Sequence, residues 1–131
     1  MATYKKLLKN RAGDTIIPVC EYDVYSTSEQ VAGIWIDGKP LYKKTINFGA
    51  LPNATQKDVQ HGISNLKRVV RFECLAYNGG AGSNTPIPLV SVVGNNSTLD
   101  IFGSYIRMNT GVDRSAFTEC YITLYYTKTT D

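Results

Sequence analysis

The sequence predicts an all-β protein, an antiparallel β-sandwich of jelly-roll-like type that follows a short amino-terminal arm. No segment keeps a helical apolar period for long, whereas short runs rich in Val, Ile, Thr and Tyr alternate apolar with polar residues. Glycine, proline and asparagine interrupt these runs about every ten residues. A chain of 131 residues is long enough for one hydrophobic core. We therefore expect an arm or attachment segment over residues 1–25 and one sandwich domain over residues 26–131.

The first half of the chain contains a short strand and a hairpin. Residues 15–19 are a strand candidate in which Pro18 favours an edge or a bend. Residues 31–36 and 41–48 flank the turn sequence DGKP, which predicts a β-hairpin. The residues that we expect to share its mostly buried face are Tyr42, Lys44, Ile46 and Phe48. A short helical turn is expected within residues 51–57.

The second half is dominated by two long strand candidates. In residues 68–77 and 119–128, apolar residues alternate with polar ones. Shorter apolar runs cover residues 87–93 and 99–108, and the second of these has a break near Gly103 and Ser104. The rows expected to face the core are Val70, Phe72, Cys74 and Ala76 in the first strand and Cys120, Ile122, Leu124 and Tyr126 in the last. The segments 78–86 and 109–117 are predicted loops.

Charge and hydropathy exclude several classes of protein. The net charge of +3 is spread over 14 basic and 11 acidic residues, which is too weak for nucleic-acid binding. The one basic cluster, Lys5, Lys6, Lys9 and Arg11, is interpreted as a solvated terminal arm. No apolar segment is long enough for membrane insertion or a secretory signal, so we expect synthesis in a reducing cytoplasm.

The sequence offers little catalytic chemistry. His61 is the single histidine, and its position in a turn favours bonds to local backbone over a role as base. Cys20, Cys74 and Cys120 are widely spaced in apolar contexts, which suits buried thiols better than metal ligands. We therefore expect no metal, no cofactor and no enzyme activity. In the segment 109–117, adjacent Asp113 and Arg114 are expected to form an ion pair that fixes a loop.

Exposed aromatic side chains and polar loops are the candidate binding features. The candidate oligomer interface comprises Trp35, Tyr121 and Tyr125. Trp35 lies between Ile34 and Ile36, so either the isoleucines face the core and the indole faces a partner, or the reverse holds. The candidate ligand residues in the two loops are Asn78, Ser83, Asn84, Asn109, Asp113 and Arg114.

Three stretches in fixed order resemble a known family. They are WIDGKPLYKKTINFGALPN, then VQHGISNLKRVV, and finally TGVDRSAFTECYITLYYTKTTD. They are similar to carboxy-terminal domains of bacteriophage tail or head fibres and related prophage structural proteins of Gram-positive hosts. The resemblance covers about four fifths of the chain, from Val24 onward, and includes no long shaft. It implies an all-β knob, usually trimeric, that belongs to the virion and is made in the bacterial host cytoplasm.

The leading hypothesis is therefore a non-enzymatic virion protein, a fibre knob or decoration. Its implied partners are two further copies of itself in a homotrimer, other virion proteins and, often, a host cell-wall or surface glycan. One alternative is a monomeric carbohydrate-binding module with stacking aromatic residues. Another is a glycan depolymerase, which would need two carboxyl groups close together in a cleft.

Overall fold

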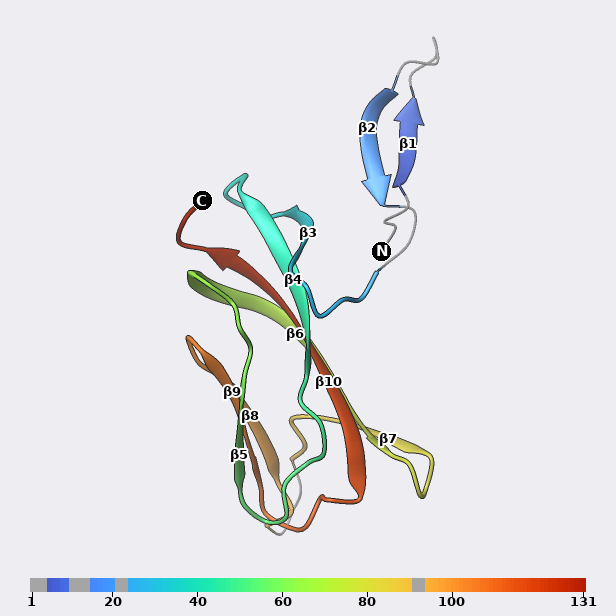
Figure 1. Ribbon diagram of the computed structural model, residues 1–131, viewed down its shortest axis with the longest axis vertical. Coiled ribbons are helices and arrows are strands. Elements are labelled where there is room, and N and C mark those ends of the chain that lie inside the picture. The colour runs from blue at the N-terminus through green and yellow to red at the C-terminus, as the bar shows by residue number, and fades with distance from the viewer. Residues whose placement is uncertain (1–4, 10–14, 21–23, 91–93) are drawn as a thin grey trace.

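The computed structural model describes residues 5–9, 15–20, 24–90 and 94–131, and of residues 5–20 it describes the backbone only. These residues form ten β-strands and contain no helix (Figure 1). The strands are β1 (Lys5–Lys9), β2 (Thr15–Cys20), β3 (Gln30–Ile34), β4 (Pro40–Asn47), β5 (Gln56–Gln60), β6 (Leu66–Asn78), β7 (Ser83–Pro86), β8 (Ser97–Ile101), β9 (Tyr105–Thr110) and β10 (Phe117–Lys128).

Two antiparallel sheets pack face to face, and a separate hairpin precedes them. The larger sheet has the strand order β3-β4-β10-β6-β7 and the smaller one β5-β9-β8. The β1–β2 hairpin lies apart from both sheets (Figure 1). The predicted all-β antiparallel sandwich is confirmed, while the jelly-roll connectivity and the division at residue 25 stay predictions. Three lysines of the predicted basic arm, Lys5, Lys6 and Lys9, lie in β1, and Arg11 lies outside the described residues.

The core forms where β10, the central strand of the larger sheet, faces the smaller sheet. The predicted row of β10, Cys120 to Tyr126 in steps of two, is almost completely buried. This row packs against Ile106 and Met108 of β9. Along β9, buried positions alternate with half-buried ones. Ile46 of β4 and Phe48, just after the strand, complete the contact, which confirms the buried face predicted for the hairpin. Hydrophobic burial over these residues is the main stabilising contribution to the sandwich.

A bulge in β6 changes one part of the predicted core row. Cys74 and Ala76 are buried as expected. Tyr125 pairs with Arg71 but Tyr126 pairs with Val69, so Val70 has no partner on β10 and Val69 takes the core-facing position. Phe72 shares a row with Leu124 yet stays more than one third exposed. A strand bulge carries no periodicity signal, which is why strict alternation placed Val70 wrongly.

Short strands account for most of the other differences between the predicted and the observed elements. The expected helical turn within 51–57 is wrong, because residues 56–60 pair with β9 as strand β5. The predicted loop 78–86 contains β7, which pairs with the end of β6. Residues 87–90 make only a single bridge, Leu89 to Ser97, and 91–93 lie outside the described residues. The expected break near Gly103 is confirmed, since it separates β8 from β9.

Candidate functional site

The larger sheet has a second face, pointing away from the core, that carries most of the exposed aromatic residues. We call it the outer face. Because opposite residues on paired strands share a face, the register arranges its side chains in four rows. The rows are Lys43–Tyr125–Arg71, Thr45–Thr123–Glu73, Asn47–Tyr121–Leu75–Pro86 and Glu119–Tyr77–Asn84.

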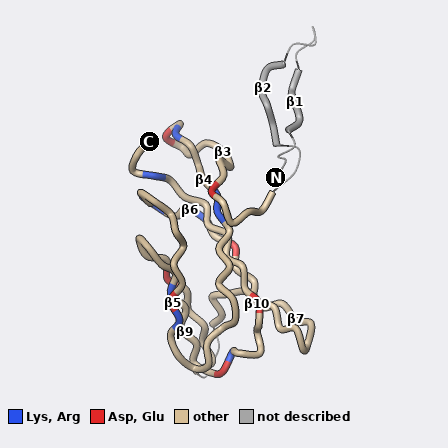
Figure 2. The backbone as a smooth tube through the Cα atoms, in the orientation of Figure 1, with Lys and Arg blue, Asp and Glu red and all other residues tan. Residues whose placement is uncertain are grey.

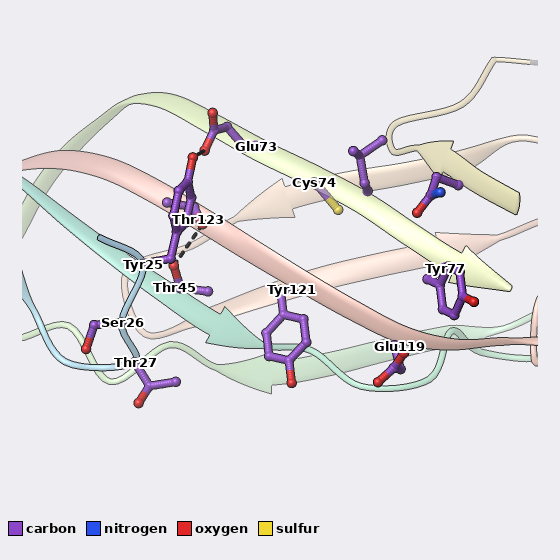
Figure 3. Close-up of a pocket in the computed structure, with 12 residues that line it drawn as sticks. Tyr25, Ser26, Thr27, Thr45, Glu73, Cys74, Tyr77, Glu119, Tyr121 and Thr123 are labelled. Carbon is purple, nitrogen blue, oxygen red and sulfur yellow. Dashed lines mark hydrogen bonds between the residues drawn. The ribbon is translucent and has the colours of Figure 1, made fainter. Parts of the chain in front are cut away.

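An open hollow of about 640 Å³ lies on this face (Figure 3). Most of its lining surface is apolar, and its lining residues include three tyrosines, two glutamates and no lysine or arginine. The lining residues are Tyr25, Ser26, Thr27, Thr45, Glu73, Cys74, Leu75, Tyr77, Asn84, Glu119, Tyr121 and Thr123. A concave, aromatic surface with a few polar groups is the usual form of a small-ligand site.

One end of the outer face is closed by cations of the protein itself. The Lys43 ammonium lies 3.9 Å from the centre of the Tyr25 ring and 5.7 Å from that of Tyr125. The Arg71 guanidinium lies 3.8 Å from the centre of the Tyr125 ring, and this contact raises the pKa of Arg71, with the nearby Glu73 charge adding to the effect. Lys43 and Tyr125 are consequently buried although they lie outside the core.

Residues 24–28 hold this closed end in place. The Thr45 amide donates to the Ser26 carbonyl, which attaches the segment to β4. The Tyr25 hydroxyl donates to Glu73 at 3.1 Å, so the phenol reaches across to β6. Beneath it the buried hydroxyls of Thr45 and Thr123 share a hydrogen bond of 2.9 Å. The Tyr25–Glu73 and Thr45–Thr123 hydrogen bonds are drawn as dashed lines in Figure 3.

The other end of the outer face is open. Tyr121 is 52% exposed and Leu75 56%, with Tyr77 and Glu119 beside them. Among the described residues, the Glu119 carboxylate accepts no hydrogen bond and forms no ion pair. In Figure 3 the Tyr121, Glu119 and Tyr77 side chains lie along the same stretch of β10 and β6. This end therefore combines aromatic surface with an unpaired negative charge.

The three predicted interface residues occupy different environments. Tyr121 is exposed as expected, whereas Tyr125 is only 6% exposed because Arg71 and Lys43 cover its ring. Trp35 lies in the turn after β3 and is half-buried, while Ile34 and Ile36 are both strongly exposed. Neither of the two alternatives for Trp35 describes this arrangement, because the turn interrupts the strand alternation on which both depended.

Of the predicted ligand residues, Asn84 alone lines the hollow. The Asn78 carboxamide accepts the Gly80 and Ala81 amides and so holds its own turn. Ser83 lies in β7 and Asn109 in β9, so both belong to strands rather than to the expected loops. The structure thus does not bring the six residues together into one site.

The expected ion pair between Asp113 and Arg114 is wrong. Asp113 instead accepts the Ser115 amide at 2.9 Å, and hydrogen bonding to Ser115 lowers the pKa of this carboxyl. Arg114 donates to the Asn95 carbonyl at 2.8 Å. Adjacent residues project in different directions, and each here fixes the backbone of a different loop.

His61 has a structural role in the turn after β5. Its Nε2 lies 2.8 Å from the Phe102 carbonyl, and its Nδ1 accepts the Ile63 amide at 3.1 Å. These contacts require the tautomer with a proton on Nε2. The predicted bonding of a turn histidine to local backbone is confirmed, and both ring nitrogens are occupied.

Two of the cysteines lie next to each other inside the core. The Sγ atoms of Cys74 and Cys120 are 3.5 Å apart on neighbouring strands, and both thiols are free. The contact with Cys120, together with burial, raises the pKa of Cys74. Cys20 lies in β2, where the structure describes only the backbone. Within the described ranges no group of three or more potential metal ligands occurs.

The carboxylates of the hollow are far apart for hydrolytic chemistry. Glu73 is opposite Thr123, four residues along β10 from Glu119. At about 3.3 Å per residue this separates the two positions by roughly 13 Å. Glycosidases place their paired carboxyl groups about 5–9.5 Å apart. The arrangement favours binding over acid–base catalysis.

The chain matches no protein-family model, no curated protein and no solved structure. In the part of the chain that the structure describes, no helix has the length and apolar character needed to span a membrane.

Proposed function

We propose that the protein is a non-enzymatic structural component of a bacteriophage virion, a fibre knob or decoration that assembles as a homotrimer and contacts a host surface glycan. The β3–β4 hairpin carries the main support. Ile34 and Ile36 at its tip are 75% and 88% exposed, and Val31 on the edge strand is also strongly exposed. Three large aliphatic side chains on one hairpin are typical of a surface that another subunit covers.

The total accessible surface of the protein also supports assembly with other subunits. It is 8096 Å², whereas a compact monomer of 14.5 kDa exposes roughly 6,900 Å². The separate β1–β2 hairpin is one projection from the sandwich (Figure 1). The exposed β3–β4 hairpin is a second projection, and burying it between copies would remove apolar surface from water.

The residues that carry the resemblance to phage fibres have structural roles in this fold. In the turn of the DGKP stretch, Asp37 accepts the Lys39 amide and Gly38 adopts a φ of +81°, which presents Ile36 at the tip. In the HGI stretch His61 ties two loops together. These roles fit a structural protein better than a catalyst.

The native mass tests this proposal. Light scattering across a dilution series should give three times the chain mass of 14.5 kDa. The double variant Ile34→Lys, Ile36→Lys should fall to one chain, because lysines oppose burial of the tip. Val90→Lys is the matched control, since Val90 is also 88% exposed but lies elsewhere. A wild-type protein that stays monomeric at all concentrations would contradict the trimer.

A monomeric carbohydrate-binding module is the second candidate, and the hollow favours it. Tyr77 and Tyr121 offer ring faces on which a sugar can stack, and Asn84 offers amide hydrogen bonds. Two variants separate the candidates: Trp35→Ala, in the turn after β3, should lower the native mass of a knob, whereas Tyr121→Ala, in the hollow, should abolish sugar binding by a module at unchanged native mass. The single tryptophan also reports assembly directly, because its emission should shift to shorter wavelength when subunits cover it.

A further inference from the structure

We propose that the open end of the outer face, formed by Glu119, Tyr121, Tyr77 and Leu75, binds a ligand that carries an ammonium group. The inference rests on the proposed function in one respect, namely that assembly through the β3–β4 hairpin leaves this end uncovered. It goes further by naming the chemical class of the ligand and the residues that hold it.

Charge is the first reason. The protein has a net charge of +3, yet the hollow is lined by two glutamates and no lysine or arginine. The neighbouring β7 hairpin carries no charged residue (Figure 2), and residues 78–99 contain none in the sequence. Glu119 therefore has no competing positive side chain among the residues that line the hollow, and its field acts on whatever enters.

The aromatic rings are the second reason. Tyr77 is directly opposite Glu119, and Tyr121 follows two residues along the same face of β10. A cation near a carboxylate and within about 6 Å of a tyrosine ring gains both charge attraction and a cation–π contribution of about 0.5–2 kcal/mol. Leu75 adds apolar surface against which the carbon skeleton of such a ligand packs.

The closed end of the same face shows this chemistry within the protein. There Lys43 and Arg71 occupy the rings of Tyr25 and Tyr125, and Glu73 lies in the adjacent row. The open end repeats the combination of tyrosines and a glutamate but supplies no cation of its own. A cation from outside completes the pattern.

Titration calorimetry with two related sugars tests the inference on the purified full chain. Glucosamine is the cationic probe and N-acetylglucosamine its neutral counterpart. We expect glucosamine to bind with a Kd on the order of 1 mM and the neutral sugar to bind about ten-fold or more weakly. Binding should weaken when the salt concentration rises, because the contribution of Glu119 is electrostatic.

Variants at exposed positions locate the site without disturbing the core. Glu119→Gln should weaken glucosamine binding about ten-fold and reduce its salt dependence, and Tyr121→Ala should remove most of the remaining affinity. Val90→Ala is the control, because this exposed residue lies outside both the hollow and the β3–β4 hairpin and should leave the affinity unchanged. A thermal melt of each variant confirms that it is folded.

Three results would overturn the inference. Equal affinity for the two sugars would identify a neutral sugar site. No binding of glucosamine by either the wild type or the Ile34→Lys, Ile36→Lys variant would show that the open end takes no ammonium ligand. A change of native mass in Tyr121→Ala would show that a second copy covers this surface. Binding by the double variant alone would instead support the ligand class and show that subunits assembled through the β3–β4 hairpin cover the open end, so the two proposals fail separately.

Discussion

The two faces of β10 are built on different physical principles. On the core face, four successive side chains from Cys120 to Tyr126 are sealed by apolar packing against a second sheet. On the outer face no sheet lies above, yet Thr123, Tyr125 and Thr127 are still buried. There the cover comes from a hydrogen bond, a lysine and an arginine on tyrosine rings, and residues 24–28. These polar contacts do not extend to Tyr121, and the exposed surface around Tyr121 is the candidate site.

The core face should respond most strongly to truncation. Ile122→Ala removes a completely buried side chain at the centre of the sandwich. We expect a loss of about 2–5 kcal/mol in the free energy of unfolding, from lost burial and from the cavity left behind. Urea unfolding followed by circular dichroism measures it. A loss below about 1 kcal/mol would show that the two sheets are not closely packed at this level.

A buried hydroxyl on the same face should have the next largest effect. The Tyr126 hydroxyl donates to Glu29 at 2.6 Å, and Lys128 donates to the same carboxylate at 2.9 Å. Tyr126→Phe should cost about 1.5–3 kcal/mol, the usual range for a hydrogen bond to a charged group. Glu29→Gln is the paired variant, and a similar loss in both would assign the effect to this bond.

The same group predicts how stability depends on pH. Burial alone would raise the pKa of Glu29, but hydrogen bonds from Lys128 and Tyr126 outweigh it and hold the pKa below its ordinary value. Its contribution is therefore present above about pH 4.3 and is lost as the pH falls through the lowered pKa. Burial and Glu29 raise the pKa of Tyr126, so its contribution is present below about pH 10 and is lost above that. Melting temperatures from pH 3 to 11 should fall at both limits, and Tyr126→Phe should reduce the alkaline fall, while the raised pKa of Tyr42, hydrogen-bonded to Asp131, maintains part of it.

The closed end of the outer face should show an intermediate effect. Thr45→Val and Thr123→Val each break the hydroxyl pair and leave one buried hydroxyl without its partner. We expect each to cost about 1 kcal/mol, and the double variant to cost less than the sum of the two. Additive losses in a double-mutant cycle would mean that the hydrogen bond contributes nothing to stability.

The open end should show the smallest effect. Leu75→Ala shortens an exposed side chain next to Cys74 in the sequence but on the opposite face. The change in the free energy of unfolding should stay within about 0.5 kcal/mol. A larger loss would mean that Leu75 is covered in solution, and the native mass would then show whether a second copy covers it.

The sequence predicted the core face better than the outer one, for a physical reason. Strict alternation of apolar residues in β10 marks a face that packs against another sheet, and that prediction is confirmed. Burial of Tyr125 and Lys43 depends on contacts between β4, β6 and residues 24–28, which no local pattern records. The bulge at Val70 is equally invisible to periodicity.

The candidate site was predicted only in part. Tyr121 and Asn84 were expected to bind partners or ligands, and both line the hollow. Tyr77, Leu75 and Glu119 were missed, although the alternation of β6 already separates Leu75 and Tyr77 from Cys74 and Ala76. The predicted ligand residues were placed in loops, whereas the hollow lies on a face of the larger sheet. The pairing of Glu119 with Tyr77 depends on the register between two strands far apart in the sequence.

The central place of β10 has a consequence for how the chain folds. β4 and β6 are separated by fewer than twenty residues, but neither pairs with the other, and each needs β10 as its neighbour. The larger sheet therefore closes only after a segment some forty residues beyond β6 has found its place between two earlier strands. Such non-local pairing slows folding. Until β10 inserts, the apolar edges of β4 and β6 are exposed to other chains, so the yield of refolding should fall steeply as protein concentration rises.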